Sequence, residues 1–121
     1  MTSQPSSFQS VPEIDVVAVG QRLSTSSLEN LQLIDVREPE ELALAQVNGF
    51  TNLPLSQYAE WSEQMHTRFD TEVETWVMCH HGMRSAQMCQ WLMQRGFQNV
   101  KNITGGIDAY SILVDSTVPR Y

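Results

Sequence analysis

The sequence predicts an α/β protein in which a mostly parallel central sheet of about five strands carries helices on both faces. Two observations support this prediction. Apolar stretches of strand length alternate with amphipathic stretches of helical spacing, which is typical of the crossover units that join parallel strands. The 121 residues are 41% hydrophobic and 17% charged, which suits one compact domain with its own core. We expect a mobile lead-in over residues 1–7 and a single domain over residues 8–121.

The first half of the chain is predicted to alternate between strands and helices. Asp15 can cap a helix whose apolar residues recur at helical spacing. Pro39 stands in the first turn of the next helix, where its missing N–H costs nothing. Ser56 is predicted to cap a third helix that runs to Arg68. The expected strands cover 11–14, 31–36 and 50–53, and the expected helices cover 16–23, 38–45 and 56–68.

The second half continues the alternation, with strands over 75–79 and 97–102 and helices over 85–95 and 107–114. Gly96 ends the first of these helices, and a pair of glycines makes a tight connection into the second. In parallel α/β sheets, ligands bind outside the carboxyl ends of the strands. Functional residues are therefore expected at Asp35–Arg37 and from Cys79 onward.

Charge and composition exclude several classes of function. Fourteen acidic residues against seven basic ones give a net charge of −7, so we expect no nucleic-acid partner. No apolar run approaches the ~18 residues of a membrane span, and we expect a cytoplasmic protein without a membrane partner. Two cysteines are too few for a secreted disulfide framework and are compatible with free thiols.

A thiol at the end of a predicted strand is the strongest chemical signal in the sequence. Cys79 ends a strand and is followed by a short loop and a helix. A free cysteine titrates near pH 8.5, so it needs help to act as a nucleophile. The N-terminus of the helix and Arg84 supply positive potential, and Gly82 lets several loop amides converge on one centre. The loop could hold a thiolate, a persulfide or an oxyanion.

Other interpretations of the same residues are less specific. A cysteine that ends a buried strand is most often a small core residue, but Gly82 and Arg84 favour catalysis for Cys79. Cys89 lies in the apolar stripe of a helix, and we expect it in the core. His80 and His81 are adjacent and have no second ligand pair, so no metal site is expected.

The segment Asp35–Arg37 leaves two alternatives open. The carboxylate can cap its own loop while Arg37 pairs with Glu38 or Glu41, which would be a structural role. The position of the segment at a strand end is equally compatible with a role in the site.

Three motifs together resemble the rhodanese family of sulfurtransferases. They are L-I-D-V-R-E-P-E-E at 33–41, C-H-H-G-M-R-S at 79–85 and G-G-I-D-A-Y at 105–110. They stand in the family's order, and the likeness extends from about residue 11 to the C-terminus. The resemblance implies a rhodanese-like fold and a double displacement in which Cys79 takes a sulfane sulfur, becomes a persulfide and passes the sulfur to an acceptor. It implies no metal and no organic cofactor.

The resemblance also assigns expected roles to the loop residues. Arg84 would orient an anionic donor such as thiosulfate, and Asp35 and Arg37 would support the site. The acceptor would be cyanide, a thiol or a sulfur-carrier protein. The remaining residues of the active-site loop are expected to bind substrate, and they are His80, His81, Gly82, Met83 and Ser85.

The chain departs from the family pattern at two places. Ala45, Gln46 and Val47 stand where the family often has Gly-His-Ile, and Tyr110 replaces a tryptophan. The tail over 114–121 resembles rhodanese modules fused to the adenylyltransferases that sulfurate carrier proteins. This likeness favours a persulfide-bearing or sulfur-carrier protein as a partner.

Two other functions compete with sulfur transfer. A cysteine-based phosphatase or arsenate reductase of related fold also places a cysteine and an arginine around an anion, but four residues separate Cys79 from Arg84, one fewer than in the phosphatase signature. The tighter ring suits a single sulfur atom better than a phosphate. A non-catalytic rhodanese module used for binding typically lacks the cysteine that is present here.

Overall fold

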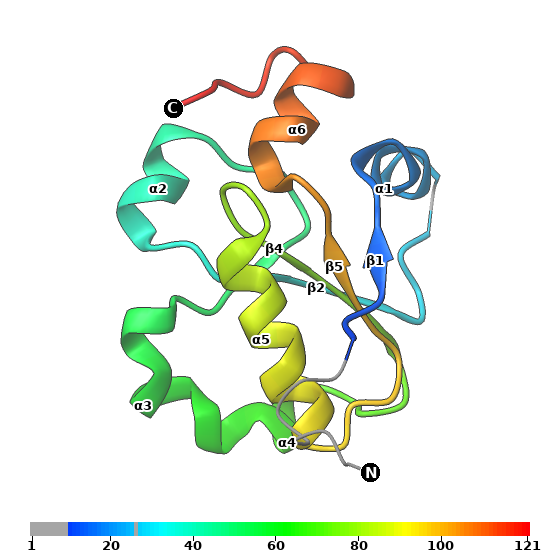
Figure 1. Ribbon diagram of the computed structural model, residues 1–121, viewed down its shortest axis with the longest axis vertical. Helices are drawn as coiled ribbons and strands as arrows, with labels where there is room; N and C mark the ends of the chain where they lie inside the picture. The colour runs from blue at the N-terminus through cyan, green and yellow to red at the C-terminus, as the bar shows by residue number, and fades with distance from the viewer. Residues whose placement is uncertain (1–9, 26) are drawn as a thin grey trace, which may run out of the picture.

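Five strands form one sheet in the computed structural model, which describes residues 10–25 and 27–121. All pairings between neighbouring strands are parallel, and their order is β1-β5-β4-β2-β3 (Figure 1). The predicted α/β class is confirmed. The predicted lead-in over 1–7 lies outside the described residues. The strands are β1 (Glu13–Ile14), β2 (Leu31–Asp35), β3 (Thr51–Asn52), β4 (Glu74–Met78) and β5 (Val100–Ile103).

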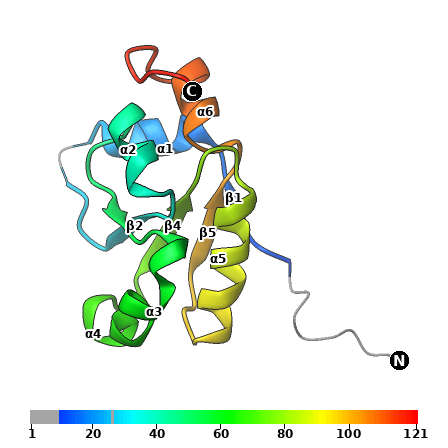
Figure 2. The ribbon, with the colours of Figure 1, turned by 90° about the vertical axis from the view of Figure 1, so that its left-hand side faces the viewer.

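Helices cover both faces of this sheet, as predicted (Figure 1, Figure 2). Successive residues of one strand point to opposite faces, so Trp76 and Val77 of β4 belong to two separate core clusters. The cluster with Val77 also contains residues of α3 (Tyr58–Trp61), α4 (Met65–Arg68) and α5 (Met83–Gln94). The cluster with Trp76 contains residues of α1 (Val16–Leu23) and α6 (Gly106–Leu113). A six-residue helix, α2 (Pro39–Leu44), follows β2.

The predicted helix over 56–68 is wrong as a continuous element. Two 3-10 turns, η2 (Leu55–Gln57) and η3 (Ser62–Gln64), alternate with α3 and α4. The Trp61 indole donates a hydrogen bond to the Pro54 carbonyl at 2.7 Å and is buried in the core. Ser56 does not cap the segment, because its amide and hydroxyl donate to the Glu38 carboxylate instead. Contacts with other elements therefore outweigh the regular helical pattern.

The other elements lie within a few residues of their predicted positions. The Asp15 side chain caps α1 as expected, accepting from the Ala18 amide at 2.8 Å. Helix α5 begins at Met83, two residues earlier than predicted, since Gly82 is its N-cap. Phe97 is a buried core residue ahead of β5 rather than part of the strand. Within the described residues, no helix combines the length and the apolar character needed to cross a membrane.

Candidate active site

The sulfur of Cys79 lies directly beyond the carboxyl end of β4, where the predicted loop begins. The residue is 1% exposed, and its Sγ accepts a hydrogen bond from the Gly82 amide at 3.0 Å. Gly82 has a φ of 107°, which residues other than glycine rarely adopt. A Cβ atom at this position would lie 3.3 Å from the Gly105 amide nitrogen. The glycine thus lets the loop fold back over the sulfur.

A serine and an asparagine complete the surroundings of the sulfur. The Ser85 hydroxyl lies 3.3 Å from Cys79 Sγ and 2.5 Å from Asn102 Oδ1. A second hydrogen bond fixes the orientation of the Asn102 side-chain amide, because its Nδ2 donates to the Gly82 carbonyl at 3.0 Å. A hydroxyl has one hydrogen, so Ser85 donates to one of its two neighbours at a time. It can therefore turn from Asn102 to a negatively charged sulfur without moving its oxygen.

The expected convergence of several loop amides on the sulfur is found only in part. Among the described residues, the backbone amide that donates to Sγ is that of Gly82. The second polar contact is the Ser85 hydroxyl, which is held by Asn102 on β5. Asn102 was not expected in the site from the sequence, because pairing of the strands brings it to the loop from 17 residues beyond Ser85.

The guanidinium of Arg84, which was expected to supply positive potential to the loop, is paired with a carboxylate. It binds both carboxylate oxygens of Glu41 on α2, at 2.7 and 3.0 Å. The side chains are 36% and 18% exposed. Arg84 is the main reason that the pKa of Glu41 falls to about 2, and Glu41 in turn raises the pKa of Arg84. Both groups are charged at neutral pH, and their charges cancel at the mouth of the site.

The tail of the chain contacts the same carboxylate. The Tyr121 hydroxyl donates to Glu41 Oε2 at 2.7 Å and accepts from Arg37 Nη1 at 3.1 Å. Its ring stacks on the His80 ring with centroids 3.9 Å apart and planes 5° from parallel. Burial, followed by the nearby His81, lowers the pKa of His80, so this imidazole is neutral at pH 7. Figure 1 shows the C-terminal end of the chain beside α2.

The segment Asp35–Arg37 forms a closed, buried ion pair. Arg37 donates from Nε and Nη2 to the Asp35 carboxylate at 2.8 to 3.1 Å, and its amide donates to Oδ1 at 3.0 Å. The Asp35 carboxylate therefore caps its own loop, as the structural alternative predicted. The arginine pairs with Asp35 rather than with Glu38 or the Glu41 side chain. Its contact with Glu41 is to the backbone carbonyl, at 3.3 Å.

A comparison with known proteins assigns the chain to a family. Residues 21–113 match the model of the rhodanese-like domain. The chain belongs to the rhodanese-like domain family. The expected rhodanese-like fold is also confirmed by a solved structure, a rhodanese-like domain protein from Staphylococcus aureus, with a TM-score of 0.72 at 22% identity. That alignment covers 92% of this chain and 99% of the other.

Relatives of this rhodanese-like chain include both short and long proteins. It is 45% identical over 94 residues to the chloroplastic rhodanese-like/PpiC domain-containing protein 12 of Arabidopsis thaliana, covering 78% of this chain and 31% of that protein. It is 33% identical over 101 residues to a sulfurtransferase of Allochromatium vinosum, covering 84% and 89%. The predicted likeness to modules fused to adenylyltransferases is confirmed by an adenylyltransferase and sulfurtransferase of Debaryomyces hansenii, 33% identical over 110 residues, covering 82% and 23%. The chain thus spans less than a third of two of these relatives.

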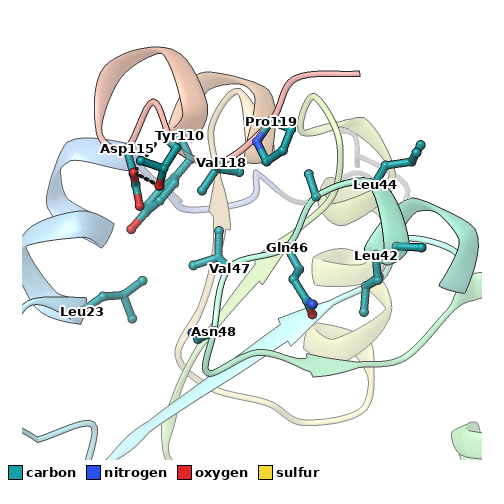
Figure 3. A pocket seen from close by; sticks show the side chains of 13 residues that line it. Leu23, Leu42, Leu44, Gln46, Val47, Asn48, Tyr110, Asp115, Val118 and Pro119 are labelled. Atoms are coloured by element: carbon teal, nitrogen blue, oxygen red, sulfur yellow. Dashed lines mark hydrogen bonds between the residues drawn. The ribbon is translucent and has the colours of Figure 1, made fainter.

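The two departures from the family pattern meet in one pocket away from the cysteine. A pocket of about 560 Å³ is lined by Ala45, Gln46, Val47 and Tyr110, with the tail residues 117–119 along one side (Figure 3). Cys79 is not among the residues that line it. The departures therefore change the surface of this rhodanese-like domain without touching its candidate nucleophile.

The remaining predicted site residues lie at the rim of the loop. Met83 is 78% exposed and points away from the core. The His81 side chain is 62% exposed, 3.7 Å from Asp108 of α6. His80, His81 and Asp108 place one potential metal ligand atom each within 4.8 Å of the others, a proximity that the sequence did not indicate. Asp108 is also paired with Arg120 at 2.8 Å. The absence of a metal site stays a prediction.

The second cysteine lies in the core, as predicted. Cys89 is fully buried in the cluster on the α5 side of the sheet. Burial raises the pKa of its thiol to about 12, so it is protonated at neutral pH. Nothing about its surroundings favours a reactive sulfur.

Proposed function

We propose that this rhodanese-like chain is a sulfurtransferase that carries a sulfane sulfur on Cys79. In the first step the Cys79 thiolate attacks the outer sulfur of the donor, the S–S bond of the donor breaks, and the leaving group departs with the bonding electron pair. With thiosulfate the leaving group is sulfite, and with a persulfide it is a thiolate. In the second step an acceptor such as cyanide attacks the terminal sulfur and leaves as thiocyanate, which restores the thiolate.

The observation that carries the proposal is the pair of donors at the sulfur. The Gly82 amide lies 3.0 Å from Sγ, and the Ser85 hydroxyl lies 3.3 Å from it and can turn toward it. The fold fixes the Gly82 amide and the Ser85 oxygen, so negative charge on sulfur is favoured after a rotation of the Ser85 hydroxyl hydrogen alone. The names of relatives as sulfurtransferases support the same conclusion.

The same geometry argues against a phosphatase. Recognition of a phosphate dianion relies on a guanidinium that can bind two of its oxygens. Here Arg84 already uses two of its nitrogens on the two oxygens of Glu41. We therefore retain sulfur transfer as the single proposed activity and propose that the site needs no metal or organic cofactor.

The partners and the location of the protein are also proposals. We propose a small sulfur donor and a thiophilic acceptor, with a persulfide-bearing or sulfur-carrier protein as the physiological partner. The likeness to a putative sulfur carrier protein of Bacillus subtilis, 31% identical over 98 residues, supports this choice. We further propose a cytoplasmic protein that binds neither nucleic acid nor a membrane.

Intact-protein mass spectrometry tests the proposed activity. After incubation with a sulfane donor, the wild type is expected to gain the mass of one sulfur atom, and cyanide should remove it. Cys79→Ser should gain none, whereas Cys89→Ala, which removes the other thiol, should be labelled like the wild type. Equal labelling of Cys79→Ser and wild type would exclude Cys79 as the sulfur carrier.

A further inference from the structure

Three arginines lie around the candidate site, and each one is paired with a carboxylate, although Arg37 is buried beneath its mouth. Arg37 binds Asp35 at 2.8 Å, Arg84 binds Glu41 at 2.7 Å, and Arg120 binds Asp108 at 2.8 Å. All seven lysines and arginines of the chain lie within the described residues. The other four are on elements away from this mouth, and they are Arg22, Arg68, Arg95 and Lys101.

Glu41 is the centre of this arrangement. Its carboxylate receives two hydrogen bonds from Arg84, one from the Tyr121 hydroxyl and one from the Glu38 amide. It is therefore held in place from α2, from α5 and from the tail. The neighbouring His80 ring is neutral at pH 7 and adds no compensating charge.

This pairing has a direct effect on the binding of anions. A dianion that enters the mouth meets an arginine whose charge is already balanced, beside a carboxylate that repels it. To bind Arg84 in a bidentate way through Nη1 and Nη2, the dianion must displace Glu41 from the two hydrogen bonds that it accepts from these atoms. A donor with less charge faces a smaller penalty, because the Coulomb energy scales with its charge.

We propose that Glu41 makes the site select a small sulfane donor with at most one negative charge, the class to which alkyl persulfides belong, and disfavour dianions such as thiosulfate. The proposal rests on the sulfurtransferase activity proposed above. In the transfer, the Cys79 thiolate attacks the terminal sulfur of R–S–S–H, the S–S bond of the donor breaks, and R–S⁻ leaves with the electron pair. The proton stays on the transferred sulfur, so charge and atoms balance.

Two donors of nearly the same shape test this selection. Methanethiosulfonate carries one negative charge and thiosulfate carries two, and both present an outer sulfur on a tetrahedral sulfur centre. For each donor, kcat/KM is measured with cyanide as the acceptor. This value is divided by the second-order rate constant for the reaction of the same donor with a free thiol in solution, which corrects for the different intrinsic reactivity of the two donors. The wild type is expected to favour methanethiosulfonate by about tenfold on this scale.

The substitution Glu41→Gln keeps the size of the side chain and removes its charge, which frees Arg84. It should raise kcat/KM about tenfold for thiosulfate and about threefold for methanethiosulfonate, because the second donor has half the charge. Glu40→Gln is the matched control, since Glu40 is an exposed carboxylate on the same helix. It should change neither value by more than about twofold, because solvent and salt screen its charge.

Three results would overturn the proposal. One is a wild type that uses thiosulfate as well as methanethiosulfonate, a measurement that needs no folded variant. Another is an equal change for both donors in Glu41→Gln, which would indicate a packing role. The third is an equal response to Glu41→Gln and Glu40→Gln, which would indicate a general surface-charge effect. Failure of the underlying activity is distinct, because neither donor would then give transfer that depends on Cys79.

Discussion

The segments that follow β2 and β4 each contain an arginine paired with a carboxylate, but the two pairs differ in kind. After β2, Arg37 and its partner Asp35 are two residues apart and are almost completely buried. After β4, Arg84 is 36% exposed, and its partner Glu41 is 43 residues away on another element. The first pair can only be part of the scaffold, whereas the second lies where a substrate can compete with it.

The largest expected effect comes from breaking the buried pair. Arg37→Ala leaves the Asp35 carboxylate buried without its cation, which costs about 3–5 kcal/mol of folding free energy. Urea denaturation followed by circular dichroism measures this loss. Arg37→Lys should recover only part of it, because lysine cannot bind both carboxylate oxygens in the same plane. A loss below about 1 kcal/mol in Arg37→Ala would contradict a scaffold role.

Breaking the exposed pair should affect activity more than stability. Arg84→Ala leaves Glu41 as an unbalanced negative charge at the mouth, so kcat/KM for thiosulfate should fall at least about tenfold. The free energy of unfolding should change by about 1 kcal/mol or less, since the pair is partly exposed. Steady-state kinetics and urea denaturation on the same samples give both values. Unchanged kinetics would remove Arg84 from the site.

The pH dependence of stability tests the exposed pair. The pKa of Glu41 is lowered from 4.5 to about 2, mainly by Arg84. A carboxyl with a lowered pKa stabilises the folded state above its unfolded pKa, and this stabilisation is lost as the pH falls from about 4.5 toward 2. After allowance for screening at Arg84, we expect about 1 kcal/mol. The difference in unfolding free energy between wild type and Glu41→Gln should shrink between pH 6 and pH 3. A constant difference would contradict this origin.

The smallest expected effect concerns the group that joins the two pairs. The Tyr121 hydroxyl contacts both Arg37 and Glu41. Tyr121→Phe keeps the ring that stacks on His80 and removes these two hydrogen bonds, so it should cost about 0.5–1.5 kcal/mol. Urea denaturation measures the loss, and Tyr121→Ala, which also removes the stacked ring, should cost more. Equal losses in the two variants would show that the ring contributes nothing.

Most of the fold could be predicted, because it depends on local pattern. Alternating apolar runs and helical stripes predicted the parallel sheet with helices on both faces, and Asp15 predicted a helix cap that the structure confirms. The segment 55–68 shows the limit. Its apolar spacing is helical, but the Trp61 bond to Pro54 and the contacts of Ser56 with Glu38 divide it into short turns. Glu38 belongs to another part of the chain and Pro54 lies just before the segment, and neither contact leaves a periodic signal.

The sequence by itself determined where the candidate nucleophile would lie. Because Cys79 ends a buried strand and precedes a glycine and a helix, the position of the thiol and the left-handed Gly82 beside it follow from local rules. Only the tertiary structure decided the charge around the thiol. It brings Glu41 to Arg84 across 43 residues of chain and Asn102 to Ser85 across 17 residues. It also brings Tyr121 to Glu41 across 80 residues. The physical reason is that an ion pair depends on separation in space, and sheet pairing sets that separation independently of distance along the sequence.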